Sequence, residues 1–248
     1  MAGQRSGDDP RLARTALARA CRLTCPTVEL LLIRHAQPVR IERTDGGAAN
    51  PPLSDLGMAQ ARAMAAWVGS ERLDAIYVSP MERARQTADP LIKASGLSPV
   101  VLAAVAEYDQ HEPVYIPIEQ LKAMHREGDG ERWLALLAGN QTDERKSWRN
   151  QIVMAIEELV GRHRGHNVAV VCHGGVINAY VTHVLGVNNP MVYEPHYTSV
   201  NRIVAASSGE RTILTLNEAP WLRDLPPITA GRLSAGAGST GPDTTSPA

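Results

Sequence analysis

The sequence contains no phenylalanine, and its aromatic residues together make up only 4% of 248 residues. A core must therefore be built from leucine, valine, isoleucine, alanine and methionine, and a hydrophobic content of 44% is enough to build one. No stretch approaches the roughly 18 consecutive apolar residues of a membrane-spanning helix, and the N-terminus lacks the apolar segment of a secretory signal. These absences argue against a membrane-spanning or secreted protein. The length fits one large α/β domain or two small ones.

The chain also lacks a charge excess, because its formal net charge is −1. General nucleic-acid binding needs a basic surface, so we expect no nucleic-acid partner. Three cysteines at irregular spacing favour a reducing compartment, and hence a cytoplasmic location. Cys21 and Cys25 could be read as a metal or redox pair, but no second pair accompanies them and we expect no metal. Cys172 is expected to be a core residue.

The two ends of the chain differ in composition from the middle. Residues 1–27 carry five arginines and are expected to form an N-terminal extension, poorly ordered or helical, with a membrane-surface role as the alternative. Residues 219–248 are expected to be a disordered C-terminal tail, because its last 20 positions are almost all Gly, Ala, Ser, Thr and Pro. A GxGxxG match at residues 236–241 follows no strand and precedes no helix, so we reject it as a dinucleotide site. The domain is expected at residues 28–218.

Two short apolar runs organise this domain. Residues 28–33 end in Arg34-His35, and residues 168–172 end in His173-Gly174-Gly175. Such runs predict buried strands of a parallel sheet, and ligands of open α/β sheets bind beyond the carboxyl ends of the strands. Strands that alternate with helices predict an α/β fold, a three-layer αβα sandwich with a mostly parallel central sheet.

The remaining elements are predicted from hydrophobic period, caps and breakers. Four helices are expected: one from Ser54, one from Ser79-Pro80, one over 143–163 and one over 174–185. In the second helix Ser79 would be the N-cap and Pro80 the first helical residue, and Pro90 makes its last turn doubtful or kinked. Strands are expected over 74–78 and 99–105, and residues 202–206 and 211–216 should form a hairpin at the edge of the sheet.

The charged residues at the expected strand ends suit one kind of ligand. Arg34 and His35, His173, and Arg83 in the first turn of its helix would meet near the helix N-terminus at Gly174. Arginine binds phosphate with two hydrogen bonds, and helix N-termini favour anions, so the set predicts a phosphoryl pocket. The chain has no HExxH, P-loop or GxSxG motif, which leaves histidine as a candidate nucleophile. Each motif taken alone is more often structural; the combination carries the prediction.

Four segments resemble, in the same order, signature segments of the histidine phosphatase superfamily, also called the phosphoglycerate mutase-like family. Residues 32–37 (LIRHAQ) resemble its RHG signature, and residues 79–88 (SPMERARQTA) resemble SPL.RA.QTA. Residues 52–61 (PLSDLGMAQA) and 171–175 (VCHGG) resemble two further segments. The resemblance implies a phosphoglycerate mutase-like fold and a metal-independent phosphatase that needs no cofactor.

The resemblance also implies roles for individual residues. His35 would be the nucleophile that is phosphorylated, while Arg34, Arg83 and His173 would hold the phosphoryl oxygens. Glu107 follows an expected strand, where the family keeps its proton donor, and would serve as acid and then base. Asp109 and Glu112 are the competing carboxylates, and the implied substrate-binding residues are Arg34, Arg83, His173, Gly174, Gln37 and Asn50.

Departures from the family pattern leave alternatives open. Ala36 replaces the usual glycine, and the segment after Glu107 lacks the RhYG.L.G run of glycolytic mutases, which favours a phosphatase over a cofactor-dependent phosphoglycerate mutase. A non-catalytic phospholigand-binding protein is the alternative of another class. We expect a small phosphorylated substrate and no membrane partner, and a homodimer is open. A cap at about 107–140 would cover the pocket. Tyr108, His111, Tyr115 and Trp133 could line the pocket or could equally well pack within the cap.

Overall fold

The computed structural model describes residues 26–128 and 142–228, which form a six-stranded sheet with helices on both faces. The strand order is β4-β3-β6-β1-β7-β8. Strands β4, β3, β6 and β1 run parallel, whereas β7 runs antiparallel to both of its neighbours. The strands are β1 (Thr27–Arg34), β3 (Ala75–Val78), β4 (Pro99–Val101), β6 (Asn167–Cys172), β7 (Val200–Ala206) and β8 (Arg211–Glu218). The expected α/β sandwich with a mostly parallel sheet is confirmed.

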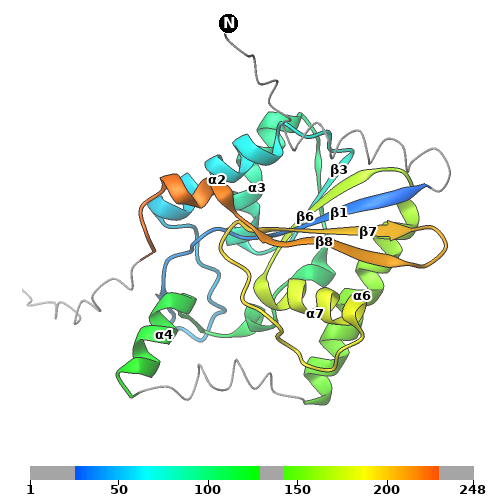
Figure 1. Cartoon of the computed structure of the whole chain (residues 1–248). Helices are drawn as coiled ribbons and strands as arrows, with labels where there is room; N and C mark the ends of the chain where they lie inside the picture. Colours follow the sequence, from blue (N-terminus) through cyan, green and yellow to red (C-terminus); the bar gives the residue numbers. More distant parts are fainter. Residues whose placement is uncertain (1–25, 129–141, 229–248) are drawn as a thin grey trace, which may run out of the picture.

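The helices divide into two layers, one on each face of the sheet (Figure 1). Helices α2 (Asp55–Val68) and α3 (Glu82–Ser95) cover one face, and α6 (Asp143–Arg162) and α7 (Gly174–Leu185) cover the other. Helix α4 (Ile118–Arg126) and a two-stranded sheet, β2 (Ile41–Glu42) with β5 (Val114–Tyr115), belong to neither layer. The described residues also contain three short 3₁₀ helices: η1 (Ala103–Val105), η2 (Tyr108–His111) and η3 (Pro220–Asp224). Within the described ranges, no helix has the length and apolarity to cross a membrane.

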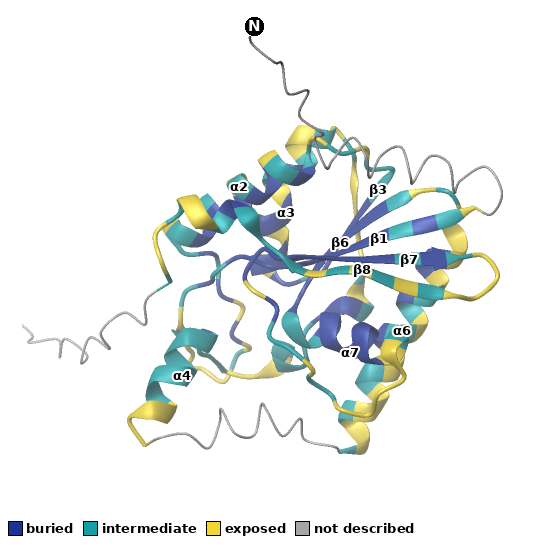
Figure 2. Ribbon diagram, in the orientation of Figure 1, coloured by how far each residue is buried: buried dark blue, intermediate teal, exposed yellow. Residues whose placement is uncertain are grey.

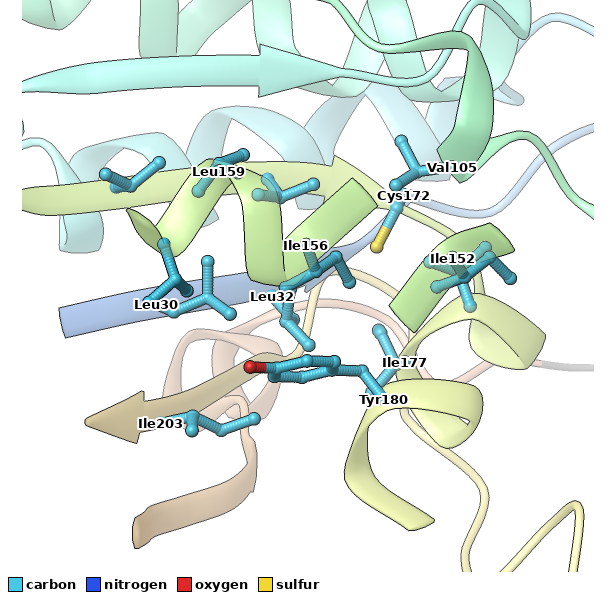
Figure 3. Close-up of a cluster of buried hydrophobic side chains, with 14 of the residues drawn as sticks. Leu30, Leu32, Val105, Ile152, Ile156, Leu159, Cys172, Ile177, Tyr180 and Ile203 are labelled. Atoms are coloured by element: carbon cyan, nitrogen blue, oxygen red, sulfur yellow. The ribbon is translucent and has the colours of Figure 1, made fainter. Parts of the chain in front are cut away.

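Strand β1 is apolar from Leu30 to Ile33 because both of its faces are buried there. Leu30 and Leu32 pack against α6 and α7, whereas Leu31 and Ile33 pack against α2 and α3. Figure 3 shows the first of these cores, with Ile156 of α6 beside the β1 leucines. The inner strands β3, β6, β1 and β7 are accordingly mostly buried, whereas the edge strand β8 is partly exposed (Figure 2). Two-sided burial turns the alternation typical of a half-exposed strand into a continuous apolar run.

Two details of the expected helix at Ser79-Pro80 are wrong. Helix α3 begins at Glu82 rather than at Pro80, and its first amide donates to the Asn50 side chain at 2.9 Å. The Ser79 hydroxyl is not its cap, because it contacts the ring of His173 at 2.7 Å. The doubt about Pro90 is also unfounded, since α3 continues through it to Ser95. Burial of one face against α2 and the sheet offsets the hydrogen bond that a proline in a helix interior removes.

The expected boundary of the disordered tail at residue 219 is also wrong. Helix η3 follows β8, and Trp221 within it is 7% exposed and packs against the α2 and α3 core. The indole of Trp221 donates to the Thr198 hydroxyl at 2.9 Å. The buried indole holds residues 220–224 on the domain, and the composition of the last residues could not predict this contact. Residues 1–25, with Cys21 and Cys25, and residues 229–248 lie outside the described residues, whereas Cys172 lies in the core as expected. The expected strand 99–105 ends at Val101 and continues as η1.

A glycine at the start of α2 is required by a backbone contact. A Cβ atom on Gly57 would lie 2.0 Å from the carbonyl oxygen of Gln37, which follows β1. We expect Gly57→Ala to lower the free energy of unfolding by about 3 kcal/mol, because backbone atoms must move to admit the methyl group. In contrast, a Cβ atom on Gly161 in α6 would have no atom within 4 Å. We therefore expect Gly161→Ala to raise the free energy of unfolding by about 0.5–1 kcal/mol. Chemical denaturation of both variants checks the pair; equal effects would contradict this account.

Candidate active site

The two histidines of the strand-end motifs lie side by side. Strands β1 and β6 are parallel neighbours, and their register pairs Arg34 with Cys172. The residues that follow these partners, His35 and His173, therefore meet beyond the same edge of the sheet, with ring centroids 5.1 Å apart. Both rings are buried, at 3% and 0% exposure. The sequence predicted this meeting from the strand ends alone.

A cavity of about 440 Å³ opens at this edge. Five of the residues expected at the site line it: Arg34, His35, Arg83, Glu107 and Gly174. Volumes of this order are typical of sites for small molecules. The other walls come from the expected cap, from α6 and from the loop before β7, and include Tyr108, Tyr115, Trp148, Met191 and Pro195. The edge of the sheet thus carries a site sized for a small ligand.

His35 is held as a neutral ring with one defined nitrogen free to react. Burial, and then the guanidinium groups of Arg83 and Arg34, keep the pKa of His35 well below its usual range. Its Nδ1 lies 2.8 Å from the carbonyl oxygen of Ala36, and a carbonyl can only accept. Nδ1 therefore carries the proton, and the lone pair is on Nε2. A neutral imidazole with a fixed tautomer is the state that nucleophilic attack requires.

His173 is also neutral, but its ring is set to donate. Burial, Arg83 and His35 keep the pKa of His173 well below its usual range. Its Nε2 lies 2.7 Å from the Ser79 hydroxyl, and the same hydroxyl accepts a hydrogen bond from the amide of Met81 at 3.3 Å. A hydroxyl that accepts from an amide can give its proton to Nε2, which leaves the ring proton on Nδ1. That Nδ1 has no partner among the described residues.

The two arginines are fixed by stacking and keep several donors unused. Arg34 donates to the carbonyl oxygen of Pro195 at 2.5 Å, and its guanidinium lies 4.2 Å from the ring centroid of Tyr197. Arg83 pairs with Asp109 at 2.9 Å and lies 4.6 Å from the ring centroid of Tyr115. Stacking occupies the guanidinium faces and leaves the N–H groups at the edge available.

The unpaired donors of these residues converge on one region. Six buried side-chain nitrogen or oxygen atoms in the described residues have no hydrogen-bond partner, and four of them are Nε of Arg34, Nε and Nη1 of Arg83, and Nδ1 of His173. Buried polar groups are normally paired, because an unmet donor costs about 1–3 kcal/mol. All four atoms are N–H donors, and two of the three residues that supply them, Arg34 and Arg83, are cationic. Such a set suits an oxyanion such as a phosphoryl group.

Glu107 lies against the second histidine segment and is partly buried. Its two oxygens accept hydrogen bonds from the amides of Tyr108 and Gly175, both at 2.9 Å. Burial, and then the charge of Asp109, raise the pKa of Glu107. A Cβ on Gly175 would lie 2.5 Å from a Glu107 oxygen, so glycine is needed there for the close approach. Asp109 and Glu112 also line the cavity, but Asp109 is occupied by Arg83.

Three residues expected to contact substrate are not among the lining residues of the cavity: His173, whose ring packs beside that of His35, and Gln37 and Asn50, which are held by other contacts. The side chain of Gln37 donates to Glu119 at 2.5 Å and accepts from the Ser54 hydroxyl at 2.8 Å. Asn50 accepts from the first amide of α3 and is exposed. Both side chains are thus occupied in holding elements together. The methyl group of Ala36 likewise packs with core residues, in a small cluster with Leu53 and Ala61.

The expectations for the cap are partly fulfilled. Tyr108 and Tyr115 line the cavity, His111 is not among the lining residues, and Trp133 lies outside the described residues. Arg145 and Arg149 of α6 also line the cavity and were not among the predicted site residues. Their spacing of four residues beside the apolar stripe was a usable signal, because it places both on the same side of the helix.

Several known proteins that are similar to this chain in sequence are named as phosphatases. The chain is 29% identical over 168 residues to phosphoserine phosphatase 1 of Hydrogenobacter thermophilus, covering 65% of this chain and 78% of that protein. It is 26% identical over 164 residues to a metal-independent phosphoserine phosphatase of Arabidopsis thaliana, covering 61% and 66%. Among solved structures, a mycobacterial glucosyl-3-phosphoglycerate phosphatase matches with a TM-score of 0.62 at 20% identity, covering 77% of this chain and 99% of that one. This last likeness concerns the fold.

The family model of the histidine phosphatase superfamily (branch 1) matches residues 30–219. This range begins in β1 and ends just past β8, so it contains all of the sheet except the first three residues of β1, and both histidine segments. With paired histidines, clustered arginine donors and a fold shared with named phosphatases, the chain belongs to the histidine phosphatase superfamily, branch 1.

Proposed function

We propose that this protein is a metal-independent phosphomonoesterase that hydrolyses a small phosphorylated metabolite through a phosphohistidine at His35. The observation that carries the proposal is the set of unpaired buried donors on Arg34, Arg83 and His173 around the free Nε2 of His35. They offer positive charge and hydrogen bonds to phosphoryl oxygens. The phosphatase names of the relatives in Hydrogenobacter and Arabidopsis support the reaction class.

In the first step, Nε2 of His35 attacks phosphorus as the bond to the ester oxygen breaks. The protonated carboxyl of Glu107 gives its proton to that oxygen, so the alcohol leaves as a neutral molecule. A carboxyl with a raised pKa is suited to this role, because at a given pH a larger fraction of it is protonated than of an ordinary glutamate. The arginines and Nδ1–H of His173 hold the three remaining oxygens and stabilise the charge on them.

In the second step, water attacks the phosphorus of phosphohistidine. The Glu107 carboxylate takes a proton from the water, the bond from Nε2 to phosphorus breaks, and inorganic phosphate leaves. His35 returns to its neutral form and Glu107 to its protonated form. The chemistry needs no metal ion, because fixed cationic and N–H donors neutralise the charge that a metal would otherwise offset. We place this activity in the cytoplasm.

A phosphatase screen over several dozen phosphorylated metabolites tests the proposal. We expect phosphate release from at least one of them, with no loss in the presence of EDTA. Strong inhibition by EDTA would contradict the mechanism. Binding of phosphate without turnover of any ester would favour a phospholigand-binding protein. A mutase assay with 3-phosphoglycerate and 2,3-bisphosphoglycerate completes the test, because rapid formation of 2-phosphoglycerate would overturn the assignment as a phosphatase.

A further inference from the structure

Two arginines on α6 line the active-site cavity but take no part in the mechanism above. Arg145 and Arg149 are one helical turn apart, so they lie on the same side of α6. Both side chains are partly buried. Neither guanidinium lies within 4 Å of a carboxylate in the described residues, in contrast to Lys146, which pairs with Asp143 at 3.2 Å.

Neighbouring contacts fix these arginines beside the reaction centre. The indole of Trp148 donates to the carbonyl oxygen of Ala106 at 3.1 Å, which anchors α6 next to Glu107. The Arg145 guanidinium lies 4.2 Å from the ring centroid of Tyr108, the residue after Glu107. Arg149 donates through Nη2 to the Thr182 hydroxyl at 2.9 Å. Stacking and this one bond leave most of the N–H groups of both arginines available.

None of the four carboxylates of the described cavity wall, Glu112 included, forms an ion pair with these two arginines. Asp109 pairs with Arg83, and Glu194 pairs with Lys122 at 2.6 Å. Both oxygens of Glu107 accept backbone amides. Partial burial lowers the pKa of Arg149, as expected for a cation that has lost water without gaining an anion. The α6 side of the cavity therefore offers two guanidinium groups to an anionic group of the ligand.

We propose that Arg145 and Arg149 form a second anion subsite, which binds a carboxylate of the substrate while its phosphoryl group lies at His35. The preferred substrates are then small phosphomonoesters that carry a carboxylate. A carboxylate matches the planar edge of a guanidinium and can accept two hydrogen bonds from it. This inference rests on the proposed phosphatase function and adds the substrate class.

Two esters that differ only at the second group test the subsite. They are 3-phosphoglycerate and the glycerol phosphate of the same configuration, in which a hydroxymethyl group replaces the carboxylate. Phosphate release gives kcat/KM for each ester in the wild type, in Arg149→Gln and in Arg145→Gln/Arg149→Gln. We expect the wild type to prefer the carboxylate ester, and the ratio of the two kcat/KM values to fall about 10- to 100-fold in the double variant. Because misfolding lowers both rates together, the ratio isolates the subsite.

Arg162→Gln is the matched control, since Arg162 lies at the other end of α6, is exposed and pairs with Glu158. It should leave the ratio unchanged. A wild type without preference, or an unchanged ratio in the double variant, would overturn the subsite. Turnover of p-nitrophenyl phosphate that disappears in His35→Ala is measured in parallel. If that turnover is absent in the wild type, the proposed phosphatase function itself fails, and the two failures are thereby distinguished.

Discussion

Replacing His35 with alanine is expected to lower kcat/KM for every phosphomonoester by at least about 10⁴-fold. The reason is that no other group in the described site combines a neutral ring, a fixed tautomer and a free nitrogen next to unpaired cationic donors. His173 cannot substitute, because its Nε2 is occupied by Ser79 and its Nδ1 carries the proton. Steady-state phosphate release measures the loss of turnover.

Trapping of the intermediate makes the same prediction more specific. Quenching of the wild type in alkaline detergent with a ³²P-labelled substrate should give a protein-bound label that survives in alkali and is lost on later treatment with acid, as expected of a phosphoramidate. His35→Ala should show no such label. His183→Ala is the control, because His183 is an exposed residue near the end of α7 and does not line the cavity. Activity or labelling that survived in His35→Ala would assign the nucleophile elsewhere.

Replacing Glu107 with glutamine is expected to lower kcat by about 10²–10⁴-fold for esters of ordinary alcohols. Glutamine retains the size of the side chain but cannot give a proton to the leaving oxygen. For p-nitrophenyl phosphate the loss in phosphoenzyme formation should be much smaller, because p-nitrophenolate leaves without protonation. Rapid-quench measurement of phosphoenzyme formation with both kinds of ester checks this difference.

Two matched variants separate Glu107 from its competitors. Asp109→Asn and Glu112→Gln change the other carboxyl groups of the cavity wall and should each cost less than about tenfold in kcat. Asp109 contacts Arg83, so its replacement should act mainly on phosphate binding. A larger loss in either variant than in Glu107→Gln would move the role of proton donor to that residue.

The pH profile follows from the direction of the Glu107 pKa shift. Phosphoenzyme formation needs the protonated carboxyl, so its rate with alkyl esters should fall as pH rises through the Glu107 pKa. Because burial and Asp109 raise this pKa, the fall occurs at higher pH than for an ordinary glutamate. Glu107→Gln should remove this limb. Asp109→Asn should move the limb to lower pH, because removing a neighbouring negative charge lowers the Glu107 pKa.

Much of the candidate active site could be predicted from the sequence, because the ends of the apolar runs mark where its residues lie. The apolar run of β1 ends at Arg34 as two-sided burial requires, and the run of β6 ends before His173 in the same way. Parallel strands present their carboxyl ends at one edge, so the meeting of the two histidines needs no further information. The Gly-rich segment after His173 opens α7 as expected, with Gly174 at the cavity wall.

The hydrogen-bond partners of several polar side chains could not be predicted from the sequence, because they depend on which groups lie nearby in the folded chain. Ser79 has the local signature of a helix cap, yet its hydroxyl bonds to His173, which lies 94 residues away in the sequence. The side chains of Gln37 and Asn50 were predicted to contact the substrate. Instead, Gln37 donates a hydrogen bond to Glu119, and Asn50 accepts one from the amide of Glu82. Such competition among distant groups leaves no trace in local spacing.

Hydrophobic period and strand ends predict the sheet, its buried strands and the two histidines and two arginines at its edge, because they are local properties of the chain. The place of Arg145 and Arg149 at the same cavity and the burial of Trp221 in the core follow only from the fold. Both depend on packing between elements far apart in the sequence. The physical reason is that burial and polar pairing are settled by neighbours in space, whereas propensity and period are settled by neighbours in sequence.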